Sequence, residues 1–400
     1  MTTGRSTLRT IVARGAVALA VAGALAIGGA GGALWVEHDR SLDLPAPTGT
    51  YAVGRAAAVW TDSSRDDPLA PAPAAKRQLV VWAWYPADPA AGAKAAPYYP
   101  AAWRTAFASH AGVLRSRFLV RNPAMVRAHA LDAPPAVPSG TTFPVVILRA
   151  GMGAYALDYT TIAEDLASHG AVVIGADAPY STVAVPMPDG RVIERTAAGN
   201  TGEAEAPGPE RDARLEQLLG VWTADTRFLL DQLGRGGAAT LQPSLAGRVA
   251  LDRVAVIGHG FGGATALQFC HDDARCRAGV DLDGAPFGSV VREGLTPPFL
   301  FLVADREGAW KGAGCVVCDH IVSAATKVHG DHRIVTLNNA DQFTFSDQSV
   351  TRSRLATRVL GALRGGGPAA SPDATAGLML VTKHLRDFLG PILAGPPGGG

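Results

Sequence analysis

The residues best suited to chemistry surround a glycine-rich turn that follows a short apolar run. Val254–Ile257 is typical of a buried strand, and Gly258, Gly260 and Gly263 follow it in the spacing G-x-G-x-x-G. After a strand, this spacing indicates a dinucleotide-binding turn. Asp283 lies roughly 20 residues further on, where such a turn has its ribose-binding acid. A dinucleotide domain usually begins with this strand, however, whereas here several predicted strands and helices precede it.

The same turn also fits the nucleophile turn of a hydrolase in which the serine has been replaced. In the pattern G-x-S-x-G, the serine stands on a strained turn between a strand and a helix, and Gly260 occupies its position here. The neighbouring residues of such a turn must be small because the backbone packs tightly around a positive φ. A second glycine-rich segment, 149–155, ends an earlier apolar run and is placed to supply another oxyanion-hole amide.

The elements that would position these residues alternate between strands and helices. Strands are expected at 51–62, 77–87, 143–151, 171–177, 252–257, 278–283, 298–303 and 333–338. Helices are expected at 101–117, 156–169, 210–234 and 375–393, and a hairpin at 185–194. This alternation predicts an α/β fold with a mostly parallel sheet that helices cover on both faces. We expect one such domain at 39–394, preceded by a targeting segment at 1–38 and followed by a flexible Gly/Pro tail at 395–400.

The N-terminal segment indicates export. Arg5, Arg9 and Arg14 precede Gly15–Val36, which carries no charge. A helix of this length spans a hydrocarbon core of roughly 30 Å, and the basic residues before it favour an extracytoplasmic domain. A membrane anchor is therefore expected, with secretion as the alternative if the segment is cleaved, for example at the A-x-A site Ala24–Ala26. A buried N-terminal core helix is the third interpretation.

The cysteines and the net charge indicate which covalent bonds, metal sites and partners to expect. In an oxidising compartment four cysteines favour two disulfides, and the expected pairs are Cys270–Cys276 and Cys315–Cys318. A zinc site that uses all four cysteines is the alternative. The net charge of +1 gives no electrostatic reason to expect a nucleic-acid partner. No metal or other cofactor is expected.

Several segments together resemble one enzyme family. They are VWTDSSRDDP, RQLVVWAWYPAD, DLASHGAVVIGADAPY, MPDGRV, TADTRFLLDQL, LDRVAVIGHGFGGATA, RAGVDLDGAPFG and FTFSD, in this order between about residues 46 and 394. The chain thus resembles the bacterial relatives of the plasma, type II platelet-activating factor acetylhydrolases. The resemblance implies an α/β-hydrolase fold and hydrolysis of carboxylic esters by a Ser-Asp-His triad.

The resemblance assigns a role to each position of that triad. Asp283 matches the acid, and Gly260 stands where the family has its serine. Gln342, three residues before the Phe of a Phe-Ser-Asp motif, stands where the family has its histidine. The oxyanion amides would be those of Met152 and Phe261.

These two replacements predict a protein that has lost ordinary esterase activity. Glycine has no attacking atom, and a glutamine amide is no base near neutral pH. Losing such groups costs on the order of a million-fold in turnover in serine proteases. We therefore expect a binding protein that takes an ester-like or lipid-like ligand or a partner. A working hydrolase or lyase that uses Asp283, Asp341 or the hydroxyls of Ser181 and Thr182 is the alternative.

Nearby histidines are not expected to replace the missing base. The side chain of His259 should point into the packing behind the turn. His329 and His332 precede the predicted strand at 333–338, whereas sites in α/β sheets gather where strands end. A solvated loop is therefore the expected surrounding of this pair.

Overall fold

A computed structural model describes residues 28–71, 75–138, 140, 142–200, 208–305, 316–363 and 373–394. Within these residues a nine-stranded sheet has the order β13-β12-β11-β10-β6-β7-β3-β2-β5. Its strands are β2 (Ala52–Asp66), β3 (Lys76–Ala87), β5 (Leu131–Asp132), β6 (Phe143–Arg149), β7 (Val172–Asp177), β10 (Val249–His259), β11 (Cys276–Leu282), β12 (Phe299–Asp305) and β13 (His332–Asn338). The expected α/β architecture is confirmed.

The six strands from β13 to β7 run parallel, whereas β3 is antiparallel to both β7 and β2. The carboxyl ends of the parallel strands therefore meet at one edge of the sheet. Glycine-rich segments follow β6 and β10 at this edge. The strand order thus brings together the two turns that the sequence analysis identified.

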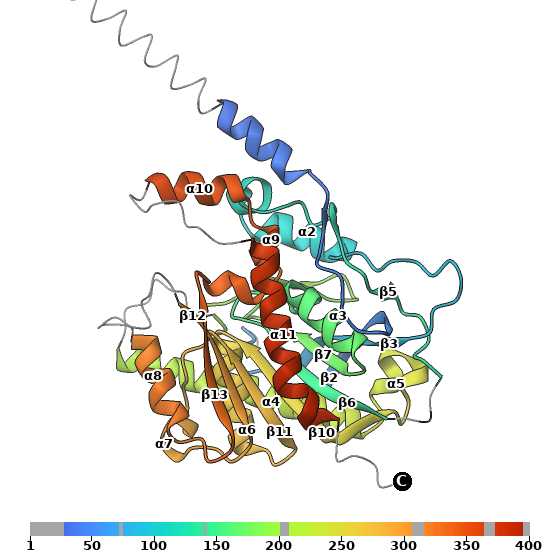
Figure 1. Cartoon of the computed structure of the whole chain (residues 1–400), viewed down its shortest axis with the longest axis vertical. Coiled ribbons are helices and arrows are strands. Elements are labelled where there is room, and N and C mark those ends of the chain that lie inside the picture. The colour runs from blue at the N-terminus through green and yellow to red at the C-terminus, as the bar shows by residue number, and fades with distance from the viewer. Residues whose placement is uncertain are drawn as a thin grey trace, which may run out of the picture.

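Helices cover both faces of the sheet (Figure 1). One face packs against α2 (Ala101–His110), α3 (Thr160–Ser168) and α11 (Ala374–Leu393), and the other against α4 (Pro209–Gly234) and α6 (Phe261–Asp272). Strand alternation separates the two cores: Val146 and Leu148 face the first layer, Val145 and Ile147 the second.

Shorter elements complete the described part of the chain. They are the two-stranded sheets β1 (Leu42–Asp43) with β4 (Val126–Arg127) and β8 (Ala184–Pro186) with β9 (Val192–Glu194), and the helices α5 (Ala238–Leu241), α7 (Val290–Glu293), α8 (Val316–Ala325), α9 (Gln348–Thr351) and α10 (Arg354–Leu363). Single turns of helix are η1 (Arg115–Leu119), η2 (Ala156–Tyr159), η3 (Pro243–Leu245) and η5 (Gln342–Phe345). The predicted hairpin at 185–194 is confirmed as β8–β9.

Two predicted elements have different bounds. The helix expected at 101–117 ends at His110, because Gly112 follows with a φ of +82° and the chain then restarts as η1. The strand expected at 51–62 extends to Asp66, where it still pairs with Lys76 across an irregularity in the register.

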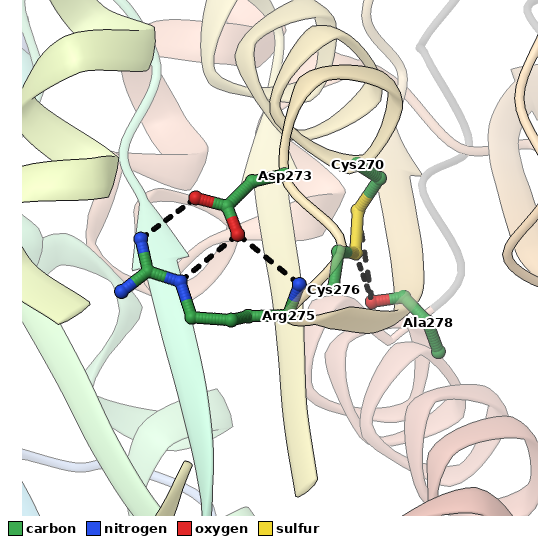
Figure 2. Close-up of a disulfide and its surroundings, with 5 residues drawn as sticks. All are labelled: Cys270, Asp273, Arg275, Cys276 and Ala278. Atoms are coloured by element: carbon green, nitrogen blue, oxygen red, sulfur yellow. Dashed lines mark hydrogen bonds and ion pairs between the residues drawn. A yellow bond between two sulfur atoms is a disulfide. The ribbon is translucent and has the colours of Figure 1, made fainter. Parts of the chain in front are cut away.

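The predicted disulfide between Cys270 and Cys276 is present (Figure 2). Cys270 lies near the end of α6 and Cys276 begins β11, so the bond joins the helix after the glycine turn to the neighbouring strand. In the loop between them, Arg275 donates to Asp273 through Nε (2.9 Å) and Nη2 (2.7 Å). This bond rules out zinc coordination by all four cysteines. Cys315, the predicted partner of Cys318, lies outside the described residues.

The N-terminal prediction falls largely outside the described part of the chain. A helix covers residues 28–38, and Glu37 in it contacts Ser353, Arg354 and Arg121. In the part of the chain that the structure describes, none of the helices combines the length and apolar character needed to cross a membrane. Most of the apolar stretch that begins at residue 15 lies outside the described residues, and so does the tail at 395–400. The expected domain limits stay predictions.

Candidate active site of a hydrolase scaffold

The glycine turn has the geometry of a nucleophile turn. β10 ends at His259, α6 begins at Phe261, and Gly260 between them has a φ of +55°. A Cβ on Gly258 would lie 1.8 Å from the Gly262 carbonyl oxygen. A Cβ on Gly262 would itself lie within 2.6 Å of the carbonyl oxygens of Arg149 and Ala150, where β6 ends. Side chains are therefore excluded at these flanking positions, as the sequence pattern predicted.

Gly260 itself faces open space and Gln342. The nearest heavy atom that a Cβ on Gly260 would meet is Gln342 Nε2, at 3.8 Å. Gln342 is the first residue of η5, which follows β13, and its side chain is exposed. None of the described residues hydrogen-bonds to its carboxamide. The structure thus brings together the two positions that the sequence analysis assigned to the serine and the histidine.

Asp283 lies on the loop that contacts the same turn. The Gly260 N–H donates to the Leu282 carbonyl (3.0 Å), and a Cβ on Gly284 would lie 2.3 Å from the Gly260 carbonyl oxygen. Asp283 is half-buried, has a φ of +55°, and accepts a hydrogen bond from the Ala304 N–H through Oδ1 (3.0 Å). The predicted acid position therefore adjoins the turn at the carboxyl edge of the sheet.

The sequence analysis missed Asp281, a buried acid beneath the turn. Its Oδ1 accepts a hydrogen bond from the Gly284 N–H (2.9 Å) and would lie 1.8 Å from a Cβ on Gly263. Burial raises the pKa of Asp281 well above its usual range. Asp281 still belongs to β11, whereas Asp283 follows the strand with a φ of +55°, and this change of backbone direction separates the two carboxylates.

The loop after β6 is tied to the turn by a buried tyrosine. The Tyr159 hydroxyl accepts from the Gly151 N–H (2.9 Å) and hydrogen-bonds with His259 Nδ1 (2.6 Å). His259 is buried and packs near the ring of Phe345, as expected for a structural residue. This arrangement holds the segment that contains Met152 against the start of α6.

Phe261 and Met152, the predicted oxyanion residues, therefore lie on adjoining segments. Phe261 is the first residue of α6, where a backbone N–H has no acceptor within the helix. Both side chains pack against the buried residues of one apolar cluster, which we call the α4 cluster: Leu69, Ala178, Leu218, Val221 and Trp222. An apolar wall thus borders the two amides.

The side chains proposed as alternative catalytic groups form hydrogen bonds within the fold. Asp341 caps η5 by accepting from the N–H groups of Phe343 (3.0 Å) and Thr344 (3.1 Å). Ser181 is buried and accepts from Trp222 Nε1 (3.2 Å). Thr182 is also buried, and its hydroxyl accepts from the Ala178 N–H (3.2 Å). None of these contacts indicates an activated nucleophile or base.

The histidine pair lies at the opposite edge of the sheet. His332 begins β13, whereas Gln342 follows the end of that strand, and both His329 and His332 are exposed. The predicted solvated surrounding is therefore observed. Among the described residues, no group of three or more His, Cys, Asp or Glu is arranged to hold a metal ion.

A buried ionic cluster supports the turn from the α4 side, and sequence reasoning missed it. Asp225 of α4 accepts from Arg77 Nη2 (2.7 Å) and Arg65 Nη2 (2.9 Å). Burial alone would raise the pKa of Asp225, but Arg77 and its neighbours outweigh that effect and lower it. Arg149, at the end of β6, lies over the Trp222 ring at 5.0 Å, and burial lowers its pKa to about 10.

Comparisons with known proteins show what this chain is similar to in sequence and fold. Residues 239–389 match the family model of platelet-activating factor acetylhydrolase, isoform II. Bovine platelet-activating factor acetylhydrolase is 28% identical over 278 residues, which cover 62% of this chain and 60% of that protein. A probable 1-alkyl-2-acetylglycerophosphocholine esterase of Arthroderma benhamiae is 29% identical over 38% of this chain and 34% of its own length. The chain thus spans less than two thirds of the length of these relatives.

A solved structure is similar to this chain over nearly its whole length. The ferulic acid esterase from Streptomyces cinnamoneus superposes with a TM-score of 0.67 at 26% identity, and the match covers 90% of this chain and 95% of that one. The fold and these relatives favour the hydrolase interpretation of the glycine turn over the dinucleotide-binding one. The chain is therefore an α/β-hydrolase-fold relative of the platelet-activating factor acetylhydrolases.

Proposed function

We propose that this protein is a ligand-binding pseudo-hydrolase that takes ester-like or lipid-like small molecules at its former catalytic centre. The observation that carries the proposal is the juxtaposition of Gly260 with Gln342, whose Nε2 would lie 3.8 Å from a Cβ on residue 260. The turn, the acid loop and the segments of Met152 and Phe261 adjoin one another at the carboxyl edge of the sheet, and the positions predicted for the serine and the histidine hold residues without the required atoms.

Acyl transfer at this site lacks two of its chemical steps. No hydroxyl at position 260 attacks the ester carbonyl, and the Gln342 carboxamide takes no proton from a nucleophile and returns none to the leaving alcohol. Backbone donors near Phe261 still polarise a bound carbonyl oxygen. Ligand binding and weak polarisation are therefore the functions that these residues support.

The first test compares hydrolysis of p-nitrophenyl acetate by the full chain and by the double variant Gly260→Ser/Gln342→His. We expect the native chain to remain near the buffer rate. The double variant should exceed it by about 10³-fold or more, because removing both groups costs still more in serine proteases. Each single variant is a matched control and should stay close to the native rate, since nucleophile and base act as a unit.

Two results would contradict the proposal. Saturable turnover by the native chain that disappears in Asp283→Ala, with the fold intact by circular dichroism, would indicate a working enzyme with another nucleophile. A double variant that binds the substrate yet shows no gain would mean that the site geometry differs from that of a hydrolase.

We also propose that the domain is exported and is held at the cell membrane by the apolar segment that begins at residue 15. The uncharged sequence after three arginines supports this proposal, and so does the Cys270–Cys276 disulfide, which is typical of oxidising compartments. Cell fractionation tests it. Full-length protein in the membrane pellet supports an anchor, whereas a shortened chain in the medium supports cleavage.

A further inference from the structure

We infer that Arg352 and Glu37 are positioning residues of the candidate site, and that the N-terminal helix at 28–38 thereby sets how firmly Gln342 is held. Arg352 holds the loop that carries Gln342, and Glu37 holds the segment that carries Arg352. The inference deepens the proposed function and rests on it, because it concerns the loop that presents Gln342 to Gly260. It does not depend on the identity of the ligand.

Arg352 contacts the residues on both sides of Gln342. Its Nη1 lies 3.5 Å from Asp341 Oδ2, and its guanidinium carbon lies 3.7 Å from the centre of the Phe343 ring. The Gln342 side chain is exposed, so its position depends on the loop rather than on packing of its own. One guanidinium therefore fixes the loop at both neighbours of the residue that faces Gly260.

The backbone of Arg352 is held by a short antiparallel ladder with the segment after η1. Two backbone hydrogen bonds flank Arg352 in this ladder. The Arg121 N–H donates to the Thr351 carbonyl (2.6 Å), and the Ser353 N–H donates to the Leu119 carbonyl (2.8 Å). Whatever fixes this ladder therefore also fixes the origin of the Arg352 side chain.

Glu37, in the last turn of the N-terminal helix, ties that helix to the ladder. Its carboxylate accepts from the N–H groups of Arg354 (3.0 Å) and Leu355 (3.3 Å), the first two residues of α10, and also from the Ser353 hydroxyl. These N–H groups have no acceptor within α10 itself. The Arg121 guanidinium lies 3.6 Å from the same carboxylate. The N-terminal helix, blue in Figure 1, is thus fastened to the start of α10.

These contacts form one continuous path from the N-terminal helix to the candidate site. The side chains of Arg352 and Asp341 are 32% and 54% exposed, so their ion pair alone contributes little. The path depends on several weak contacts that act together, and removing either end should loosen the loop without unfolding the domain. The apolar segment proposed as an anchor leads directly into this helix, so the anchor and the ligand site are joined through it.

The first experiment measures hydrogen–deuterium exchange in the full-length native chain and in the variants Arg352→Met and Glu37→Ala. The reporters are the amides of Phe343, Thr344 and Ser346, which are hydrogen-bonded within the loop. We expect both variants to exchange here about 5- to 10-fold faster, because an exposed ion pair and a cation–π contact together amount to about one factor of ten in an equilibrium constant. Exchange in β6 should not change.

Arg354→Met is the matched control. Arg354 is exposed, lies two positions from Arg352 and contributes its backbone N–H to the path, so this variant should leave the loop amides at the native rate. Glu37→Gln keeps an acceptor oxygen and should recover part of the effect of Glu37→Ala. Thermal melting verifies that all variants are folded. Native exchange rates in both Arg352→Met and Glu37→Ala would overturn the inference.

The second experiment adds Arg352→Met to the variant Gly260→Ser/Gln342→His and measures hydrolysis of p-nitrophenyl acetate per folded molecule. A loosely held base is misplaced in the chemical step, so kcat should fall by about 10-fold while KM stays within about twofold. Arg352→Lys keeps the charge that faces Asp341 and should recover part of the loss. A higher KM with an unchanged kcat would mean that Arg352 binds the ligand instead, and the inference would be wrong.

The two experiments separate this inference from the proposed function. If the double variant is inactive but the loop amides respond, the proposed function is wrong and the path from the N-terminal helix remains. If the double variant is active but neither exchange nor kcat responds, the inference is wrong and the pseudo-hydrolase remains. A response in Arg352→Met alone would contradict the role of Glu37 and of the N-terminal helix.

Discussion

The two sides of the glycine turn differ in how much freedom the structure leaves them. On the inner side, Gly258 lies against the Gly262 carbonyl, and Gly263 lies against the buried carboxylate of Asp281. On the open side, Gln342 is the only one of the described residues near the place where a side chain on Gly260 would start. The inner side is thus fully packed, and the open side carries Gly260 and Gln342, the two residues that the sequence analysis predicts to be replacements.

This difference indicates that the shape of the turn and the chemical groups presented on it depend on different residues. The φ of +55° at Gly260 follows from the packing of β10, α6 and the loop after β6, and it does not require a serine. A residue without a side chain at this position is therefore compatible with the turn. The predictions below test this comparison through stability: large costs are expected on the inner side and small ones on the open side.

The largest effect is expected at the ionic cluster below the turn. Asp225→Asn should lower the free energy of unfolding by about 3–5 kcal/mol, because it removes the buried carboxylate that Arg77 and Arg65 share and leaves Arg77 only Asp67 as a charge partner. Urea denaturation at pH 7 measures the loss. The exposed pair Asp189–Arg191 provides a control, in which Asp189→Asn should cost about 0.5 kcal/mol or less.

The same carboxylate predicts a pH dependence. The pKa of Asp225 is lowered in the folded protein, so the unfolded chain takes up its proton first as the pH falls. The stabilising contribution is therefore complete above the unfolded pKa, about 3.9, and is lost as the pH falls through the lower folded value. The gap between the denaturation midpoints of the native chain and Asp225→Asn should stay constant from pH 6 to about 4 and shrink as the pH falls further. A gap that does not shrink below about pH 4 would contradict this assignment.

The next effect is expected at the tightest glycine. Gly258→Ala should destabilise the fold by about 3 kcal/mol, because its Cβ would overlap a backbone carbonyl oxygen that has no room to move. Gly220→Ala is the matched control, since a Cβ at this position of α4 meets no other part of the described chain within 4 Å, and it should stabilise the helix by about 0.5–1 kcal/mol. Equal stability of the two variants would mean that the inner side is not tightly packed.

A smaller effect is expected from the disulfide that joins α6 to β11. The double variant Cys270→Ser/Cys276→Ser should lose about 2 kcal/mol, because the bond closes a short loop with a sequence separation of six. Thermal unfolding of the native chain with and without reductant gives an independent value. If both treatments leave stability unchanged, the bond does not hold the helix after the turn.

The smallest effect is expected on the open side. Gln342→Leu should change the free energy of unfolding by less than about 0.5 kcal/mol, because the side chain is exposed and no described residue hydrogen-bonds to it. A loss of 2 kcal/mol or more would mean that Gln342 has become a structural residue, and the contrast between the two sides would disappear.

The sequence predicted most of the elements because their signals are local. Continuous apolar runs such as Val254–Ile257 indicate buried parallel strands, and the long apolar stripe of 210–234 indicates one covering helix. The helix expected at 101–117 was too long because one glycine with a positive φ ends it, and a residue's φ depends on its surroundings.

The buried polar groups beneath the turn were not predictable in this way. Asp225 lies within an amphipathic helix and looks like any surface acid in the sequence, yet its partner Arg77 is 148 positions away. Asp281 likewise resembles a strand-end acid. Charges become buried only through long-range pairing, and a sequence without contacts does not show which acids and bases meet.

The sequence by itself determined which atoms are missing, since Gly260 and Gln342 have no nucleophile and no base in any conformation. It also determined the small residues that a sharp strand-to-helix turn requires. Only the tertiary structure decided that Gly260 and Gln342 face each other, although 82 positions separate them in the chain. The physical reason is that parallel strands end at a common edge, so the order of β13, β11 and β10 in the sheet brings their following loops together.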